Sequence, residues 1–204
     1  MNAPMNNALT VAAVQGVEEN NANVIRPYVN TAENVVEPNW LQPKFENIPD
    51  ALKQQPWAVW IAEPRLGKPG KFNKAPRSPE TGSRIGADKP HLFGNFDASK
   101  ATYDRGGYTG VGVLLTGNGI VGVDIDDIRN TIARPEVTQW ISSALDEGAY
   151  CEKSPSGTGL RLFMKGKLPG KGRKYGTCEI YDDVRFLTVT GHAITMLEDI
   201  WVPS

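Results

Sequence analysis

Most apolar residues of this chain occur in short runs, separated by glycine, proline and other turn-forming residues. The run at residues 57–62 predicts a β-strand. The runs at 111–115 and 120–125 flank a turn at 116–119, which predicts a β-hairpin. Residues 63 to about 92 are rich in Gly, Pro and Lys and predict a long loop.

Helical spacing appears only in two places along the chain. Asp97 is a good N-cap for a short helix that ends near residue 103. Pro135 stands at a first helical position, and apolar residues recur at helical spacing as far as Leu145, before Gly148. Strands follow at residues 149–153, 161–164, 178–181 and 186–189. We therefore predict an α+β fold with a mostly antiparallel sheet.

The first part of the chain shows no periodic pattern of apolar residues. Nine asparagines precede Trp40, and large apolar residues are few there. We predict a flexible, Asn-rich arm over residues 1–45, with one short ordered piece near residues 40–45. The remaining residues, 46–204, are expected to form a single domain.

Composition excludes several classes of protein. The apolar fraction of 40% indicates a globular domain, and no apolar run approaches the roughly 20 residues of a membrane span. No secretory signal is recognisable at the N-terminus. Cys151 and Cys178 have no metal-ligand spacing, and we expect a reduced pair in a cytoplasmic protein that has no membrane partner.

The charges are unevenly distributed although the net charge is only −1. Residues 65–77 and 161–174 carry basic side chains and no acid, whereas acidic residues gather at 124–127 and 146–152. Two basic segments beside an acidic cluster would suit a polyanion held next to a metal site. Charge alone favours solvated loops rich in Gly and Pro.

Three acidic residues have the spacing of a metal site. Asp124 and Asp126 lie two residues apart on a strand, so both carboxylates point to one face, while Val123 points into the core. Glu179, on a later strand, offers a third carboxylate. Oxygen ligands of this kind suit Mg²⁺ or Mn²⁺, and such a set serves two-metal phosphoryl transfer. The two aspartates alone could equally be a solvated strand end.

Three segments, in order, resemble the motifs of the archaeo-eukaryotic primase superfamily, and within it the primase-polymerase domains of phages, plasmids and integrated elements. They are residues 119–127 (GIVGVDIDD), 154–161 (SPSGTGLR) and 179–191 (EIYDDVRFLTVTG). Residues 57–60 (WAVW) and 71–76 (KFNKAP) resemble the opening of the same group, and the match covers about residues 56–192. Three motifs in order are much more specific than one.

The resemblance implies a fold and an activity. The fold would pack an N-terminal αβ unit with a unit like the RNA-recognition fold, and the active site would lie between them. The activity would be template-directed nucleotidyl transfer from nucleoside triphosphates in DNA replication. Asp124, Asp126 and Glu179 would then be the catalytic acids and the ligands of Mg²⁺ or Mn²⁺.

The resemblance also implies how the substrates bind. The second motif would cradle the triphosphate through Ser154, Ser156, Arg161 and the backbone near Gly157 and Gly159. Many family members carry histidine at the position of Arg161. Arginine here preserves phosphate binding, but it removes any role for a proton-transferring imidazole. Further candidates are Arg185 and His192 for the nucleotide, and Lys71, Lys74, Lys171, Arg173 and Lys174 for single-stranded DNA.

Alternative functions use the same residues. A non-catalytic module could hold single-stranded DNA or nucleotides for a replication partner, and a metal-dependent nuclease could use the same acids. Related proteins continue into a helical region that helps priming, and often into a replicative helicase, which is a candidate partner. We therefore expect primer extension more readily than primer synthesis from this chain.

Overall fold

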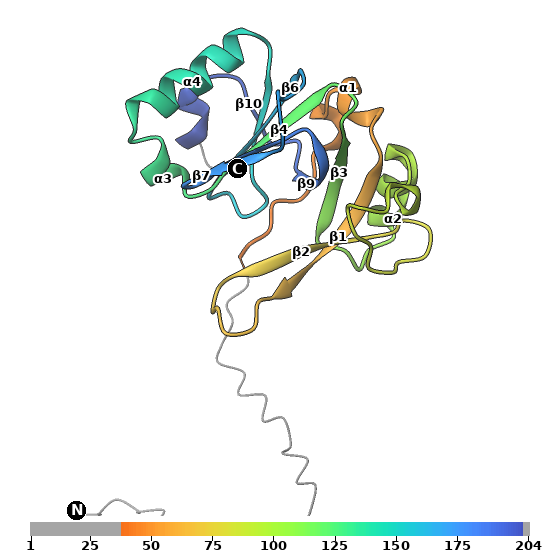
Figure 1. Cartoon of the computed structure of the whole chain (residues 1–204). Coiled ribbons are helices and arrows are strands. Elements are labelled where there is room, and N and C mark those ends of the chain that lie inside the picture. Colours follow the sequence, from red (N-terminus) through yellow and green to blue (C-terminus); the bar gives the residue numbers. More distant parts are fainter. Residues whose placement is uncertain (1–37, 202–204) are drawn as a thin grey trace, which may run out of the picture. The chain divides into compact units, whose positions relative to one another are not determined.

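Two antiparallel β-sheets form the frame of the protein, for which a computed structural model describes residues 38–201 (Figure 1). One sheet has four strands in the order β2-β1-β3-β9, and the other has six in the order β10-β5-β6-β4-β8-β7. Every paired neighbour within these sheets is antiparallel. The predicted α+β class with antiparallel sheets is confirmed.

The strands of the four-stranded sheet are β1 (Trp57–Pro64), β2 (Phe72–Arg77), β3 (Gly110–Thr116) and β9 (Asp183–Val189). Those of the six-stranded sheet are β4 (Ile120–Ile125), β5 (Tyr150–Lys153), β6 (Leu160–Lys165), β7 (Arg173–Tyr175), β8 (Cys178–Tyr181) and β10 (Ala193–Ile194). The α-helices are α1 (Asp50–Lys53), α2 (Phe96–Asp104), α3 (Ile128–Thr131) and α4 (Pro135–Asp146), and the 3-10 helices are η1 (Phe45–Asn47), η2 (Pro90–Leu92) and η3 (Leu197–Trp201).

The core of the four-stranded sheet forms around β1 and β3. Val111 and Val113 are fully buried, as is Trp57. The Trp57 indole donates from Nε1 to the Leu52 carbonyl at 2.9 Å, which ties α1 to the strand. Its ring also meets Phe96 edge-on at 5.1 Å, which ties α2 to the same place. Burial of these side chains is the main force that holds this sheet to its helices.

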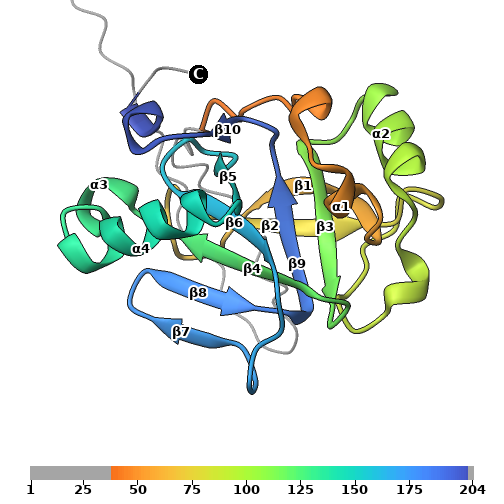
Figure 2. The same ribbon diagram turned by 90° about the horizontal axis from the view of Figure 1, so that it is seen from above.

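The six-stranded sheet has a core of its own on one face, while Ile120 and Phe163 on its other face join the core of the four-stranded sheet. Val123 and Ile125 of β4 and Leu162 of β6 pack with Ile141 and Ala144 of α4. Figures 1 and 2 show α3 and α4 on this face of the sheet. Since side chains alternate along a strand, the residues between the buried ones point to the other face. That other face is the one that carries the acidic residues of β4.

The hairpin predicted between residues 111–115 and 120–125 is wrong. Both strands exist, but β3 pairs with β1 and β9, whereas β4 pairs with β6 and β8. The connecting turn contains Gly117 and Gly119, both with positive φ, as a hairpin turn would. The partners that satisfy the two strands come from distant parts of the chain, so the turn passes from one sheet to the other.

The long loop predicted over residues 63–92 is also corrected, because it contains β2. This strand pairs with β1 in a register that sets Lys74 opposite Ala62. As β2 is an edge strand, it keeps polar side chains and a proline that a central strand would not, and these hide it in the sequence. A smaller correction concerns α2, where Asn95 rather than Asp97 is the N-cap and accepts from the Ala98 amide at 2.8 Å.

The other predicted elements are found where the pattern placed them. The helix at residues 135–146 and the antiparallel pair β5 and β6 are confirmed. Residues 1–37 of the predicted arm lie outside the described residues. The stretch that follows touches the domain, since the Leu41 amide donates to Pro155 and the Lys44 amide to Thr190, each at 2.8 Å. No helix within residues 38–201 is long and apolar enough to cross a membrane.

Candidate active site

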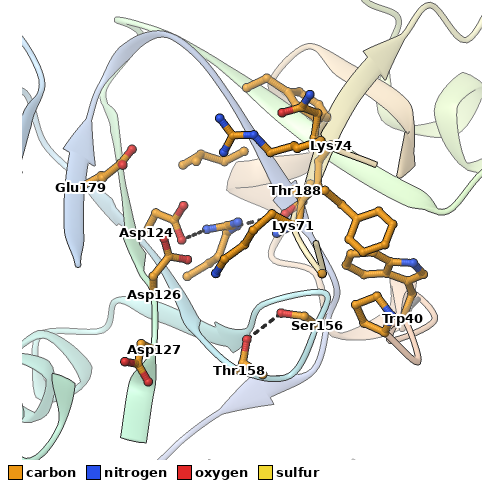
Figure 3. A pocket seen from close by; sticks show the side chains of 18 of the residues that line it. Trp40, Lys71, Lys74, Asp124, Asp126, Asp127, Ser156, Thr158, Glu179 and Thr188 are labelled. Carbon is orange, nitrogen blue, oxygen red and sulfur yellow. Dashed lines mark hydrogen bonds and ion pairs between the residues drawn. The ribbon is translucent and has the colours of Figure 1, made fainter. Parts of the chain in front are cut away.

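A cleft of about 870 Å³ lies beside the polar face of the six-stranded sheet. Asp124, Asp126 and Glu179 line one wall, and Lys71 and Lys74 of the four-stranded sheet and its preceding loop line the facing wall (Figure 3). The structure thus brings the predicted acids together with residues of both predicted basic segments, since Arg161 and Lys174 line the same cleft.

The strand register places five charged residues in one row across the sheet. Asp124 of β4 lies opposite Arg161 of β6 on one side and Glu179 of β8 on the other. The row continues to Glu152 of β5 and to Lys174 of β7. Two like charges stand side by side only at Asp124 and Glu179 within this row, an arrangement that disfavours the sheet unless cations balance it.

Arg161 is fixed in the row by two contacts. Its guanidinium is almost fully buried and forms an ion pair with Asp124 through Nη1. Its Nε donates to the Thr188 hydroxyl of β9 at 3.1 Å. Because both partners are held by strands, the guanidinium is presented to the cleft in one orientation.

Cations and a tyrosine surround Glu179. It forms ion pairs with Lys174 and, at 2.6 Å, with Arg185, and it accepts from the Tyr181 hydroxyl at 3.0 Å. The Arg185 guanidinium also lies over the Tyr181 ring, 4.2 Å from its centroid. Partial burial raises the pKa of Glu179, but the bonds from Lys174 and Tyr181 and the charge of Arg185 outweigh it, so the net pKa lies below its usual range.

Asp126 is the free acid of the cleft. Its side chain is exposed there, and no other residue within 38–201 gives its carboxylate a hydrogen bond or ion pair. Desolvation by the surrounding protein, followed by the charge of Asp124, raises the pKa of Asp126. A cation between the two aspartates would relieve this repulsion.

Two of the carboxylates in the cleft could hold a divalent cation. Within residues 38–201, no group of three or more His, Cys, Asp or Glu side chains is arranged to hold a metal ion. Mg²⁺ is usually held by one or two carboxylates together with substrate phosphates. Asp126 fits that pattern together with Asp124, of which only Oδ1 pairs with Arg161, whereas both oxygens of Glu179 are engaged, by Lys174 and by Arg185.

Lys74 faces these charges from β2. Burial, followed by the nearby Arg161 charge, lowers the pKa of Lys74 to about 8, although Asp124 and Asp126 oppose the shift. A lysine with so low a pKa is more sensitive to its surroundings than a surface lysine, and such groups gather at functional sites. The sequence analysis named Lys74 as a candidate for single-stranded DNA, and the structure places it in the cleft beside the acids.

The turn at residues 154–159 borders the cleft and divides its predicted ligands into two kinds. The Ser154 hydroxyl is buried and accepts from the Gly159 amide at 3.0 Å, so it closes the turn. Ser156 and Thr158 bond each other at 2.8 Å through their hydroxyls, and both line the cleft. Gly157 has a φ of 71°, which the turn requires and which favours glycine.

Three predicted site residues lie away from the cleft. The His192 ring bonds the Gln42 carbonyl through Nε2 at 2.9 Å. Lys171 and Arg173 border a smaller pocket next to Leu168. Alternation along β7 leaves Lys174 as the residue of that segment that lines the acidic cleft.

Trp40 lines the cleft but was not predicted as a site residue. Its ring packs edge-on against Trp60 at 5.6 Å and against Phe72 at 5.4 Å. Its indole Nε1 is buried and has no hydrogen-bond partner within residues 38–201. The signal available in the sequence was a lone tryptophan that follows an Asn-rich stretch.

Glu152 is a second residue beside the site that the sequence did not predict. The side chain is fully buried and accepts from the Thr190 and Gly191 amides at 2.9 and 2.8 Å and from the Tyr150 hydroxyl at 2.9 Å. Burial raises the pKa of Glu152 to about 7, although these bonds and the charge of Arg161 oppose the shift. A single acid in a strand gives no sequence signal of this role.

The chain is similar in sequence to a phage protein. No family model matches the chain. The chain is 30% identical over 152 residues to a DNA primase-polymerase of Nitratiruptor phage NrS-1. The match covers 71% of this chain and 20% of that protein, so it spans about a fifth of the relative's length.

Proposed function

We propose, from the premise that this chain is a relative of phage-type DNA primase-polymerases, that it transfers nucleotides to a DNA strand under the direction of a template. That relative supports the resemblance to phage-type primase-polymerases. The observation that supports catalysis most directly is the row of charges in which Asp124 lies between Arg161 and Glu179 and faces Lys74 across the cleft.

The incoming triphosphate would lie between the two walls of the cleft. Lys71 and Lys74 would contact its phosphates from one side, and Arg161 and the hydroxyls of Ser156 and Thr158 from the other. Trp40 and Phe72 supply the apolar end, which suits the base or sugar. This arrangement follows the polarity of a nucleotide, which has one highly charged and one flat, apolar end.

The reaction would be an in-line displacement at the α-phosphorus. The primer 3′-hydroxyl oxygen forms the new phosphodiester bond, the bond to the β-phosphate oxygen breaks, pyrophosphate leaves, and the hydroxyl proton passes to solvent. Asp124 and Asp126 would hold Mg²⁺ or Mn²⁺, which when bound would acidify the hydroxyl and neutralise phosphate charge. Arg161 and Lys74 would hold the triphosphate in line with the attacking oxygen.

Glu179 takes a role of its own in this proposal. Its ion pairs hold Lys174 and Arg185 at the edge of the cleft, where both cations can meet phosphates. We retain it as a third acid of the site through these cations. The six-stranded sheet with α3 and α4 is our candidate for the unit like the RNA-recognition fold, and the four-stranded sheet with α1 and α2 for the αβ unit.

Two other functions use the same acids. A nuclease would need the aspartates but not the basic wall and the hydroxyls of the 154–159 turn. A pure binding module for single-stranded DNA would be weakened by placing Asp126 without a partner beside a polyanion. Primer synthesis, a helicase partner and a cytoplasmic location remain predictions from the sequence and the family.

The test is incorporation of labelled nucleotides on primed and unprimed single-stranded templates, with Mg²⁺ and with Mn²⁺. Asp126→Asn is the informative variant, because its carboxylate holds no structural contact within residues 38–201 and the fold should survive. We expect at least about a hundredfold loss of incorporation. The matched control is Asp146→Asn, which changes an exposed aspartate at the end of α4, outside the cleft.

Equal incorporation by wild type and Asp126→Asn would refute catalysis at this cleft. Degradation of the labelled template that depends on Asp126 would instead favour the nuclease. Products on the unprimed template would add primer synthesis to extension.

A further inference from the structure

A second cavity lies on the opposite face of the six-stranded sheet, beneath α4. It has a volume of about 300 Å³ and an almost wholly apolar surface. We call it the apolar slot, and it is formed by Val123 and Ile180 of the sheet, Val137 and Trp140 of α4, and Arg173 and Tyr175 of β7. None of these residues takes part in the proposed reaction.

The rim of the apolar slot exposes two large aromatic rings. The Tyr175 side chain is 79% exposed and Trp140 is 40% exposed, whereas Trp57 and Trp60 are buried. Exposed aromatic side chains beside an apolar cavity mark a surface that binds something flat or apolar. Both rings stand at the mouth of the same cavity.

Two arginines accompany the aromatic rings. Arg134 is held at the slot by weak contacts of its Nη2 with the Thr177 hydroxyl at 3.4 Å and the Cys178 sulfur at 3.7 Å. Arg173 lies opposite Ile180 in the strand register. Two acids, Glu136 of α4 and Glu179 of β8, also line the slot. The carboxylate of Glu179 is held by Lys174. Aromatic rings for stacking together with cations for phosphates are the features of sites for single-stranded nucleic acid.

The apolar slot and the cleft lie on the two sides of β7. This strand forms the edge of the six-stranded sheet (Figure 2). Lys174 lines the acidic cleft, and its neighbours Arg173 and Tyr175 line the slot. A strand of nucleic acid that crosses this edge therefore passes from Lys174 directly to Tyr175 and Arg173, with cations on both sides.

We propose that the apolar slot binds unpaired bases of the single-stranded DNA template outside the catalytic cleft. A base stacks on Tyr175 or Trp140, and Arg173 and Arg134 contact the neighbouring phosphates. The proposal rests on the proposed function for the identity of the strand. An apolar peptide from a protein partner would use the aromatic rings and leave the two arginines without a role.

The first test is the affinity of the full chain for fluorescent oligo(dT), without nucleotide or metal. Tyr175→Ala should weaken binding about five- to hundredfold, which is the effect of losing one stacked base. Tyr175→Phe should retain most of the affinity, because the ring is kept. The control is Leu92→Ala, which removes another exposed apolar side chain on η2, outside the slot, and should bind like wild type.

A second test uses the thiol of Cys178, which lines the slot. Cys151 is buried and its pKa is raised by burial to about 12, so a maleimide should label Cys178 selectively. Saturating oligo(dT) should slow this labelling several-fold, and Cys178→Ser should abolish it. Tyr175→Ala should remove the protection at oligonucleotide concentrations that protect the wild type.

The results separate this proposal from the proposed function. Wild-type oligo(dT) affinity in Tyr175→Ala, or unchanged labelling of Cys178 with the oligonucleotide bound, would overturn the slot whatever the chain catalyses. Protection of Cys178 in a chain that incorporates no nucleotide would support the slot and refute the polymerase. Protection by an apolar peptide but not by oligo(dT) would also overturn the proposal, in favour of a protein partner.

Discussion

At the scale of single residues, the site is organised by buried charge. Arg161 stands between Asp124 and Glu152 in the register, and both acids lie at positions where an unpaired charge is costly. Many members of the primase superfamily that the motifs resemble carry histidine at the position of Arg161. Arginine keeps its charge near neutral pH, whereas the pKa values of two of its neighbours, Glu152 in the row and Lys74 on the facing wall, are shifted toward neutrality.

Glu152 should make stability depend on pH. Its pKa of about 7 in the folded protein lies above the usual value, so its stabilisation is full below that usual value and is lost as pH rises through 7. Relative to Glu152→Gln, the unfolding free energy of wild type should fall by about 2–3 kcal/mol between pH 5 and pH 8. Urea unfolding of both proteins at several pH values measures this. Parallel pH curves would show that the carboxyl is ionised throughout.

Lys74 should make nucleotide affinity depend on pH. Its pKa of about 8 means that it is charged below pH 8 and loses its charge above, so phosphates are held less tightly in alkaline solution. We expect the Kd for a non-hydrolysable triphosphate to rise up to about tenfold from pH 7 to pH 9. Lys74→Arg should give a flatter curve, because guanidinium stays charged. The same slope in both proteins would contradict a role for Lys74.

At the scale of elements, the cleft combines interior and edge strands. Asp124, Arg161 and Glu179 lie on β4, β6 and β8 inside the six-stranded sheet. The lysines Lys74 and Lys174 lie instead on β2 and β7, each of which ends a sheet. Edge strands tolerate polar and basic side chains. These two lysines of the cleft are therefore carried by strands that the core constrains least.

Trp40 tests whether the segment before η1 belongs to the site. Trp40→Ala removes the ring that packs on Phe72 at the apolar end of the cleft, and it should raise the Kd for a nucleoside triphosphate roughly fivefold. Asn39→Ala changes the exposed neighbour and is the matched control. Titration of intrinsic or ligand fluorescence gives both constants. Equal affinities would place the nucleotide away from this segment.

At the scale of the whole domain, the two sheets meet closely at Gly122 of β4. A Cβ added there would overlap Leu187 of β9 and lie 2.9 Å from Leu115 of β3. The glycine therefore lets the sheet that carries the acids approach the sheet that carries the basic wall. We expect the width of the cleft to depend on this contact.

Gly122→Ala should push the two sheets apart. We expect a loss of about 1–3 kcal/mol in the free energy of unfolding, because overpacking strains a closed core. Gly170→Ala is the control, since a Cβ added there meets nothing within 4 Å. Urea unfolding measures both, and triphosphate affinity should fall only in Gly122→Ala. An unchanged free energy of unfolding in Gly122→Ala would show that the sheets are not in firm contact at this point.

The elements with strong local patterns were predictable, and those with tertiary causes were not. Helical spacing after Pro135 and the alternation around Asp124 are local properties of the chain, and α4 and β4 follow them. The hairpin failed because strand partners are chosen over long distances, as the pairing of β3 with β9 illustrates. β2 was missed because an edge strand need not be apolar.

The sequence by itself determined which side chains share a face, because alternation along a strand is a property of the backbone. Asp124 and Asp126 are together for that reason. Only the tertiary structure decided what faces them. Arg161 and Glu179 meet Asp124 through the register of β4 with β6 and β8, and Lys74 arrives from the other sheet. These neighbours lie tens of residues apart in the chain, so the packing of the two cores selects them and no local pattern encodes them.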